Sequence, residues 1–364
     1  MIKNKLKKKF LIFSANRSEF FILYNIISKL AEKKYSFELV CSREVYDIIL
    51  QLEDNKINNF ILKNIIKIKL NFYELEKYRQ IIDSFRNQVP KINDYNYIIV
   101  YGDRIETYFF SKYCFYNNKK LIHLGGGEIT SGSMDNKYRY AISSISDYHF
   151  VTNKNSKKIL KNFNQNVFDI GYFLPKNKNC IIKKNRDLFE KLNKPYFLIT
   201  YHSNTLADFS TNKYEINELL KSLNNFKHNF YFVFTYPNPD KFNVIIIKKI
   251  NLFIKENNKN SFFVHTLGID YPYFMKNAYL LLGNTSSGIH ESPYYGIPTI
   301  NIGDRQKGRS ISRNILNCKN ESSEITFKLN EIINNYKRYN IKTKIKIASF
   351  KKFQKNLDKI ITYE

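Results

Sequence analysis

Residues 279–291, YLLLGNTSSGIHE, join a short apolar run to a loop of small polar residues, and residues 299–309, TINIGDRQKGR, have the same arrangement. Short apolar runs that end at a glycine and are followed by helical stretches predict parallel strands buried on both faces. In sheets of this kind, ligands bind beyond the carboxyl ends of the strands. These two loops are therefore the first place to expect a site.

The same alternation of apolar runs and amphipathic stretches extends over the whole chain and predicts an α/β fold. Strands are expected at residues 9–14, 36–41, 97–101, 120–123, 149–152 and 167–169, and then at 196–201, 230–236, 261–264, 279–282 and 299–302. Residues 19–33 predict a helix because Phe20, Leu23 and Ile27 recur at helical spacing.

The polar stretch PKNKNCIIKKNRD, residues 175–187, interrupts this pattern and predicts an inter-domain connection. We expect a first domain over residues 1–175 and a second over 176–345. Residues 325–363 have helical periodicity, and residues 346–364 are expected to form a helix that packs back on the first domain.

Composition excludes several classes of protein. The chain has 364 residues, of which 43% are hydrophobic and 25% charged, with only 12 Gly and 8 Pro, so a disordered or collagenous protein is excluded. Its apolar runs are shorter than the roughly 18 residues of a membrane span, and the apolar run at residues 10–13 is too short for a secretion signal. The four cysteines, Cys41, Cys114, Cys180 and Cys318, have no metal-binding spacing and predict reduced thiols, so a cytoplasmic location is expected.

The net charge of +27 raises the possibility of a nucleic-acid partner. The lysines are spread over the whole chain rather than gathered on one arm or helix face, and the densest cluster, residues 3–9, precedes the first strand. No nucleic-acid partner is therefore expected, although a positive field would attract a phosphorylated small substrate.

Three loops of the first half carry candidate residues. In SANRSE, residues 14–19, the side chains could form a helix cap beside a surface Arg17, or contribute to a site. In YGDRIET, residues 101–107, Asp103 could cap the next helix or supply a carboxylate at the sheet edge. In HLGGGEITSGSMD, residues 123–135, three consecutive glycines are hard to explain by core packing and suggest close approach to a ligand or a loop that moves. Glu128 and Asp135 flank its second half and suit proton transfer, although Asp135 could also cap a helix.

The second half adds two loops. His202 directly follows a strand, where it is either structural or functional. In residues 283–291, backbone N–H groups at the helix start predict a diphosphate site, for which Arg305, Lys307 and Arg309 could supply cations. A plain Ser/Gly turn is the alternative. Neither GxxxxGK[ST] nor GxGxxG is present.

Four segments, YGDRIET, HLGGGEITSGSMDNKYR, GNTSSGIHESP and NIGDRQKGR, resemble in this order the UDP-N-acetylglucosamine 2-epimerase family, and especially its hydrolysing branch. That branch makes N-acetylmannosamine for sialic acid or related sugars for legionaminic acid. The similarity runs from about residue 11 to residue 318. It implies a glycosyltransferase-B-like architecture, in which two Rossmann-like domains face a cleft, usually in a homodimer.

The resemblance also implies roles for individual residues. Asp103, Glu128 and Asp135 are implied as acid/base carboxylates, and His202 as the cleft histidine. The nucleotide-binding positions that it implies are Arg17, Ser286, Ser287, Gly288, Glu291 and Arg309. The chain departs from the family pattern at Gly125, where many relatives carry Glu or His, and at Tyr140 and Ser144, where a His and a Lys are usual.

The implied reaction expels the nucleoside diphosphate, removes the C2 proton to give a 2-acetamidoglycal, and adds water to release the free 2-epimerised sugar. No nicotinamide, flavin or obligatory metal is implied. The expected conversion is UDP-N-acetylglucosamine to N-acetylmannosamine and UDP, with UDP- or GDP-N,N'-diacetylbacillosamine as the alternative substrate. Two alternative functions are a glycosyltransferase of the same architecture and a sugar-nucleotide-binding protein whose catalytic site has been lost.

Overall fold

The computed structural model describes residues 9–52, 55–69, 78–89, 91–162, 164–174 and 183–362. The chain forms two compact units. The first unit comprises Met1–Glu128, Asp135–Pro175 and Lys346–Glu364, and the second comprises Ile129–Met134 and Lys176–Ile345. Two expected segments lie partly outside the described residues. They are the lysine cluster at residues 3–9, of which only residue 9 is described, and the connection at residues 175–187, of which residues 183–187 are described.

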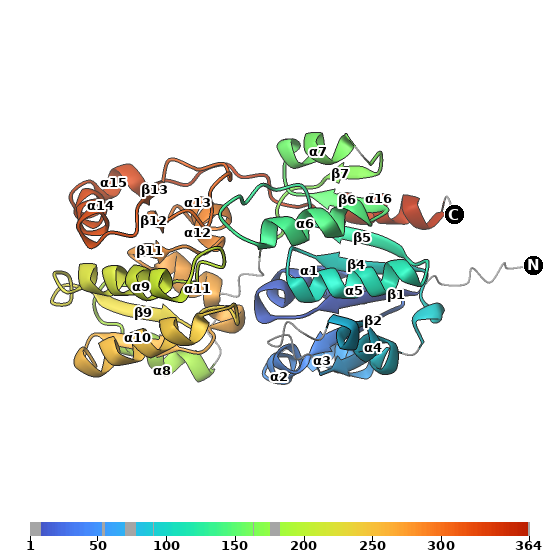
Figure 1. The fold of residues 1–364 in the computed structure, drawn as a ribbon, viewed down its shortest axis with the longest axis horizontal. Helices are drawn as coiled ribbons and strands as arrows, with labels where there is room; N and C mark the ends of the chain where they lie inside the picture. The colour runs from blue at the N-terminus through green and yellow to red at the C-terminus, as the bar shows by residue number, and fades with distance from the viewer. Residues whose placement is uncertain are drawn as a thin grey trace, which may run out of the picture. The chain divides into compact units, whose positions relative to one another are not determined.

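The first unit is built on a parallel sheet of seven strands in the order β3-β2-β1-β4-β5-β6-β7 (Figure 1). These strands are β1 (Phe10–Ser14), β2 (Phe37–Ser42), β3 (Ile65–Ile68), β4 (Tyr97–Tyr101), β5 (Lys120–Leu124), β6 (Tyr148–Val151) and β7 (Val167–Asp169). The order reverses between β1 and β4. Loops that leave those two strands therefore diverge and open a crevice at their carboxyl ends.

Helices connect these strands, as the sequence predicts. They are α1 (Arg17–Glu32), α2 (Arg43–Leu50), α3 (Asn55–Lys63), α4 (Tyr78–Gln88), α5 (Ile105–Tyr116), α6 (Asp135–Ser144) and α7 (Lys154–Lys161). Helix α16 (Phe350–Thr362) also belongs to this unit, although it follows the second unit in the chain. The Asn16 side chain accepts a hydrogen bond from the Glu19 amide at 3.1 Å and caps α1. This contact is the helix cap expected as one alternative for residues 14–19.

The second unit has a parallel sheet of six strands in the order β10-β9-β8-β11-β12-β13. They are β8 (Tyr196–Thr200), β9 (Tyr231–Thr235), β10 (Ser261–Val264), β11 (Leu280–Gly283), β12 (Thr299–Ile302) and β13 (Ile315–Cys318). Its helices are α8 (Lys183–Lys191), α9 (Phe209–Leu223), α10 (Asn243–Glu256), α11 (Tyr271–Asn277), α12 (Ser287–His290), α13 (Ser292–Tyr295), α14 (Ser322–Asn334) and α15 (Tyr336–Tyr339).

Both faces of this second sheet are buried. Along β8, Phe197 and Ile199 belong to one apolar cluster, whereas Tyr196 and Leu198 belong to another that includes Met275 of α11. Alternate residues of one strand thus enter cores on opposite faces, as expected of a doubly covered parallel sheet. The predicted α/β fold with two Rossmann-like domains is confirmed.

The structure adds three details to the sequence-based expectation. Strands β3 and β13 were not expected, and the helical periodicity over residues 325–363 is divided among α14, α15 and α16. Helix α15 ends at Tyr339 and α16 begins at Phe350, and residues 340–349 contain no helix. In residues 341–347, IKTKIKI, β-branched side chains alternate with lysine, a pattern that disfavours a helix.

Helix α16 completes the core of the first unit. Phe353 and Leu357 are fully buried, and the ring of Phe353 lies 4.8 Å from that of Phe150 in β6. Tyr97 of β4 donates a hydrogen bond from its hydroxyl to the Ile360 carbonyl at 3.2 Å.

Candidate functional site

Asp103 and Glu128 of the first unit are connected through one arginine. Arg139 of α6 is only 2% exposed, and its Nη2 pairs with the Asp103 carboxylate. Its Nη1 donates to the Glu128 carbonyl oxygen at 2.9 Å. One buried cation therefore pairs with the Asp103 carboxylate and also fixes the backbone at Glu128.

The capping alternative for Asp103 is wrong. Helix α5 begins at Ile105, and its N-cap is Arg104, which makes no side-chain capping bond. Gly102, with φ +82°, turns the chain after β4, so Asp103 lies at the carboxyl end of that strand. Asp135 is the first residue of α6, so it begins the helix that carries Arg139.

Glu128 is itself fixed by a second contact. Its Oε1 accepts a hydrogen bond from the Thr152 hydroxyl at 2.6 Å, just after β6, and the residue is buried. A buried carboxylate that accepts a hydrogen bond from a hydroxyl group is held in one orientation, as a proton-transfer group requires.

The expectation that packing does not explain the three glycines is wrong for two of them. A Cβ on Gly126 would lie 2.8 Å from the Ser143 Oγ, and one on Gly127 would lie 2.7 Å from the Ser156 carbonyl oxygen. Gly127 also has φ +78°, where a side chain is strained. Close packing against α6 and α7 therefore accounts for glycine at both positions.

The β1–α1 loop contains a more enclosed arginine than expected. Arg17 is not a surface residue, because its side chain is 13% exposed and lies 4.0 Å from Glu44 Oε1. Burial lowers its pKa, partly offset by Glu44, and the guanidinium remains charged.

Glu19, in the first turn of α1, joins the loop after β1 to the first turn of α5, and sequence reasoning missed it. Its carboxyl oxygens accept hydrogen bonds from the Ala15 amide at 3.2 Å and the Thr107 hydroxyl at 3.0 Å. Burial and the nearby Glu106 raise its pKa to about 8, although Arg104 acts in the opposite direction.

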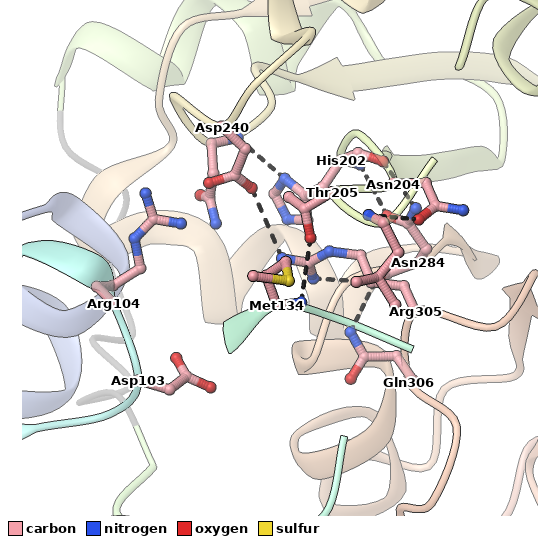
Figure 2. A network of polar contacts seen from close by, with 12 residues as sticks. Asp103, Arg104, Met134, His202, Asn204, Thr205, Asp240, Asn284, Arg305 and Gln306 are labelled. Atoms are coloured by element: carbon pink, nitrogen blue, oxygen red, sulfur yellow. Dashed lines mark hydrogen bonds and ion pairs between the residues drawn. The ribbon is translucent and has the colours of Figure 1, made fainter. Parts of the chain in front are cut away.

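In the second unit, His202 is held by Asn284 (Figure 2). The Asn284 side chain accepts from the His202 amide at 2.7 Å and donates to the His202 carbonyl at 2.8 Å. The Asn238 amide donates to His202 Nδ1 at 2.9 Å, so the proton of the neutral ring is assigned to Nε2. This arrangement fixes both the backbone and the ring of the predicted histidine.

The loop after β12 packs against the same asparagine. Gln306 donates from Nε2 to the Asn284 carbonyl at 2.8 Å, and Arg305 pairs with the buried Asp240 at 3.7 Å (Figure 2). Arg309 donates from Nη1 to Gln306 Oε1 at 2.6 Å. Lys307, the third expected cation, is exposed.

The loop after β11 contains the predicted serines, but the helix that follows is a single turn, Ser287–His290. Ser286 is its N-cap and makes no side-chain capping bond, so a long helix does not contribute here. Ser287 is buried, and its hydroxyl lies 2.8 Å from the Tyr271 hydroxyl and 3.1 Å from that of Thr285. A Cβ on Gly288 would lie 3.0 Å from Thr299 Cγ2.

Glu291 ends this loop as a buried acid. Its Oε2 has no hydrogen-bond partner among the described residues, and burial raises its pKa to about 8. A buried carboxyl with this pKa is mainly protonated at neutral pH and can both donate and accept, so its unpartnered oxygen is suited to a ligand hydroxyl.

The segment Ile129–Met134, which follows Glu128, belongs to the second unit. The Ser131 amide donates to the Lys307 carbonyl at 3.0 Å, and the Met134 amide donates to the Thr205 hydroxyl at 3.3 Å. A Cβ on Gly132 would lie 1.7 Å from the Asp304 carbonyl oxygen, so only glycine permits this approach.

The described part of the chain holds no group of three or more His, Cys, Asp or Glu side chains arranged for a metal ion. None of the helices described is both long and apolar enough to cross a membrane. Cys41, Cys114 and Cys318 are buried free thiols, and Cys180 lies outside the described residues.

Two Rossmann-like units with polar residues at the strand ends place the chain among proteins of glycosyltransferase-B-like fold. The solved UDP-GlcNAc 2-epimerase of Neisseria meningitidis bound to UDP-GlcNAc superposes with a TM-score of 0.79, at 18% identity, over 98% of this chain and 100% of that one. The sequence matches the profile of the UDP-N-acetylglucosamine 2-epimerase family over residues 75–350.

Two curated relatives are more similar in sequence. The GDP/UDP-N,N'-diacetylbacillosamine 2-epimerase (hydrolyzing) of Campylobacter jejuni is 33% identical over 86% of this chain and 85% of its own length. The polysialic acid biosynthesis protein P7 of Escherichia coli is 29% identical over 89% of this chain and 85% of its own length. The chain therefore belongs to the UDP-N-acetylglucosamine 2-epimerase family.

Proposed function

We propose that this protein is a hydrolysing 2-epimerase of a nucleotide-linked 2-acetamido sugar. The observation that carries the proposal is the arrangement around Arg139, which pairs with the Asp103 carboxylate and binds the Glu128 backbone, while the Glu128 carboxylate is oriented by Thr152. A glycosyltransferase removes no C2 proton and therefore needs no ordered proton-transfer carboxylates.

The C2 hydrogen of the substrate is not acidic, so the nucleoside diphosphate leaves first with the electron pair of the C1–O bond. The C2 proton of the resulting oxocarbenium-like species then passes to a carboxylate, for which Asp103, Glu128 and Asp135 are the candidates. The product of that step is a 2-acetamidoglycal. Water adds at C1, a proton returns to C2 from the other face, and the free epimerised sugar is released.

We assign the leaving group to the second unit. Ser286, Ser287 and Gly288 would donate hydrogen bonds to the diphosphate, and Arg309 would neutralise its charge. The Glu291 carboxyl, whose Oε2 has no partner among the described residues, suits a ribose hydroxyl. His202, held with Nε2 protonated, would be a donor near the departing oxygen.

The substrate is the finer question. The chain is 33% identical to the Campylobacter jejuni enzyme and 24% identical to the UDP-N-acetylglucosamine 2-epimerase of Neisseria meningitidis. This difference in sequence identity favours a nucleotide-linked N,N'-diacetylbacillosamine as the substrate. UDP-N-acetylglucosamine is the second candidate.

The test is incubation of the purified protein in heavy water with UDP- and GDP-linked forms of both sugars, with products followed by NMR. We expect a free 2-epimerised sugar carrying deuterium at C2, together with the nucleoside diphosphate. Recovery of an intact epimerised nucleotide sugar would instead indicate the non-hydrolysing reaction, and transfer of sugar to an acceptor alone would indicate a glycosyltransferase.

A further inference from the structure

Two pairs of hydroxyl groups lie in the second unit. The Thr235 and Thr200 hydroxyls, at the ends of β9 and β8, lie 2.8 Å apart. The Tyr271 hydroxyl of α11 lies 2.8 Å from the Ser287 hydroxyl of α12. The second pair connects a residue outside the predicted loops to one of the predicted serines.

The contact between Tyr271 and Ser287 has a preferred direction. Each hydroxyl has one proton to donate and lone pairs to accept, and the phenol, being more acidic than an aliphatic alcohol, is the better donor. Tyr271 therefore donates to Ser287. The Ser287 hydroxyl then has one lone pair satisfied and its own proton available for a further acceptor.

In the structure the nearest acceptor ahead of Ser287 is Thr285 Oγ1, at 3.1 Å. Thr285 Oγ1 is also the acceptor for the Ser287 amide, at 3.4 Å. An anionic oxygen is a stronger acceptor than a hydroxyl that already accepts an amide proton. A ligand oxygen can therefore replace Thr285 as the partner of the Ser287 hydroxyl without disturbing the contact between Tyr271 and Ser287.

We propose that Tyr271 is a positioning residue for diphosphate binding, in which its hydroxyl donates to Ser287 and so directs the Ser287 proton toward the phosphate. Tyr271 itself does not touch the ligand. This inference rests on the proposed function, because it takes the nucleoside diphosphate as the ligand of Ser287.

The test is a double-mutant cycle on nucleoside diphosphate affinity. Calorimetry with UDP and with GDP is performed on the wild-type chain, Tyr271→Phe, Ser287→Ala and the double variant. We expect Tyr271→Phe to weaken binding by about threefold to thirtyfold, the range of one charge-assisted hydrogen bond that loses its orientation. In the Ser287→Ala background the same change should have no further effect, because the group it positions is absent.

Tyr196→Phe is the matched control. Tyr196 is a buried tyrosine at the start of β8, and its hydroxyl donates to the Phe274 carbonyl at 2.5 Å. That variant should lose stability without losing affinity. Tyr271→Gln keeps a side-chain donor and should retain more affinity than Tyr271→Leu, which keeps the inference testable even if Tyr271→Phe folds poorly.

The outcomes separate this inference from the proposed function. Unchanged affinity in Tyr271→Phe, or equal losses from that change in the presence and absence of the Ser287 hydroxyl, would overturn the positioning role while leaving the epimerase proposal intact. If the wild-type chain binds neither UDP nor GDP, the proposed function fails and this inference fails with it.

Discussion

Glu19 couples the stability of the first unit to pH. It is buried between the loop after β1 and the start of α5, and its pKa of about 8 lies well above the usual 4.5. Between those two values an unfolded chain releases a proton that the folded chain keeps. The contribution of Glu19 to the free energy of unfolding is thus largest below pH 4.5 and falls as the pH rises toward 8.

Replacing Glu19 with glutamine should remove this pH dependence. The amide oxygen can still accept from the Ala15 amide, and the amide nitrogen can donate to the Thr107 hydroxyl, so both contacts have a replacement. Relative to Glu19→Gln, the wild-type protein should lose stability between pH 5 and pH 8 by at most about 1.4 kcal/mol per pH unit. Urea denaturation at several pH values measures the difference.

The control on the same helix is Glu32→Gln, since Glu32 lies at the exposed end of α1 beside Lys29. Its stability curve should run parallel to that of the wild type. Parallel curves for Glu19→Gln as well would show that Glu19 is ionised in the folded protein at neutral pH.

At the scale of the element, Gly132 decides whether the segment Ile129–Met134 can lie against the loop after β12. In Gly132→Ala the new methyl group would meet the Asp304 carbonyl, so the backbone must shift and the Ser131–Lys307 hydrogen bond must lengthen. We expect a loss of about 1–3 kcal/mol of stability and faster hydrogen exchange at the Ser131 amide.

Ser131→Ala is the comparison for this variant. It removes the hydroxyl contact to the Lys307 carbonyl at 3.3 Å but keeps the amide contact at 3.0 Å, so its effect should stay within about 0.5 kcal/mol. Unchanged exchange at Ser131 in Gly132→Ala would mean that the segment is not held at this point in solution.

Elements with a clear local signal could be predicted from the sequence, and others could not. The strands at Ser261–Val264 and Thr299–Ile302 were predicted with their observed bounds, because each is an apolar run between polar residues. Strand β3 is only four residues, IIKI, with a lysine inside it, and its place beside β2 is decided by pairing rather than by local pattern.

The same distinction applies to the candidate site. Asp103, Glu128, His202 and Ser287 follow strands closely enough for the sequence to indicate them. Tyr271 is distant in sequence from Ser287 and has no motif around it, so only the fold brings the two hydroxyls together.

For the whole molecule, the proposed division of labour predicts that turnover and nucleotide affinity can be lost separately. Glu128→Gln in the first unit should abolish turnover while UDP or GDP still binds with near wild-type affinity, since the amide can still accept from Thr152. Arg309→Ala in the second unit should weaken that binding by a few kcal/mol at most.

Calorimetry and a turnover assay on both variants check this expectation. The thermal unfolding of each variant should remain close to that of the wild type, which excludes general misfolding as the cause. A Glu128→Gln protein that turns over normally but no longer binds nucleotide would contradict the assignment of both units.

The return of the chain to its first unit has a consequence for synthesis on the ribosome. The last strand of that unit's sheet ends at residue 169. Phe353, Leu357 and the Ile360 carbonyl that Tyr97 contacts are translated roughly two hundred residues later. Until α16 emerges from the exit tunnel, apolar side chains around Phe150 remain uncovered. The second unit, whose residues from 176 to 345 are contiguous apart from one short segment made earlier, can finish folding first. The half of the protein that is translated first is thus the half that is completed last.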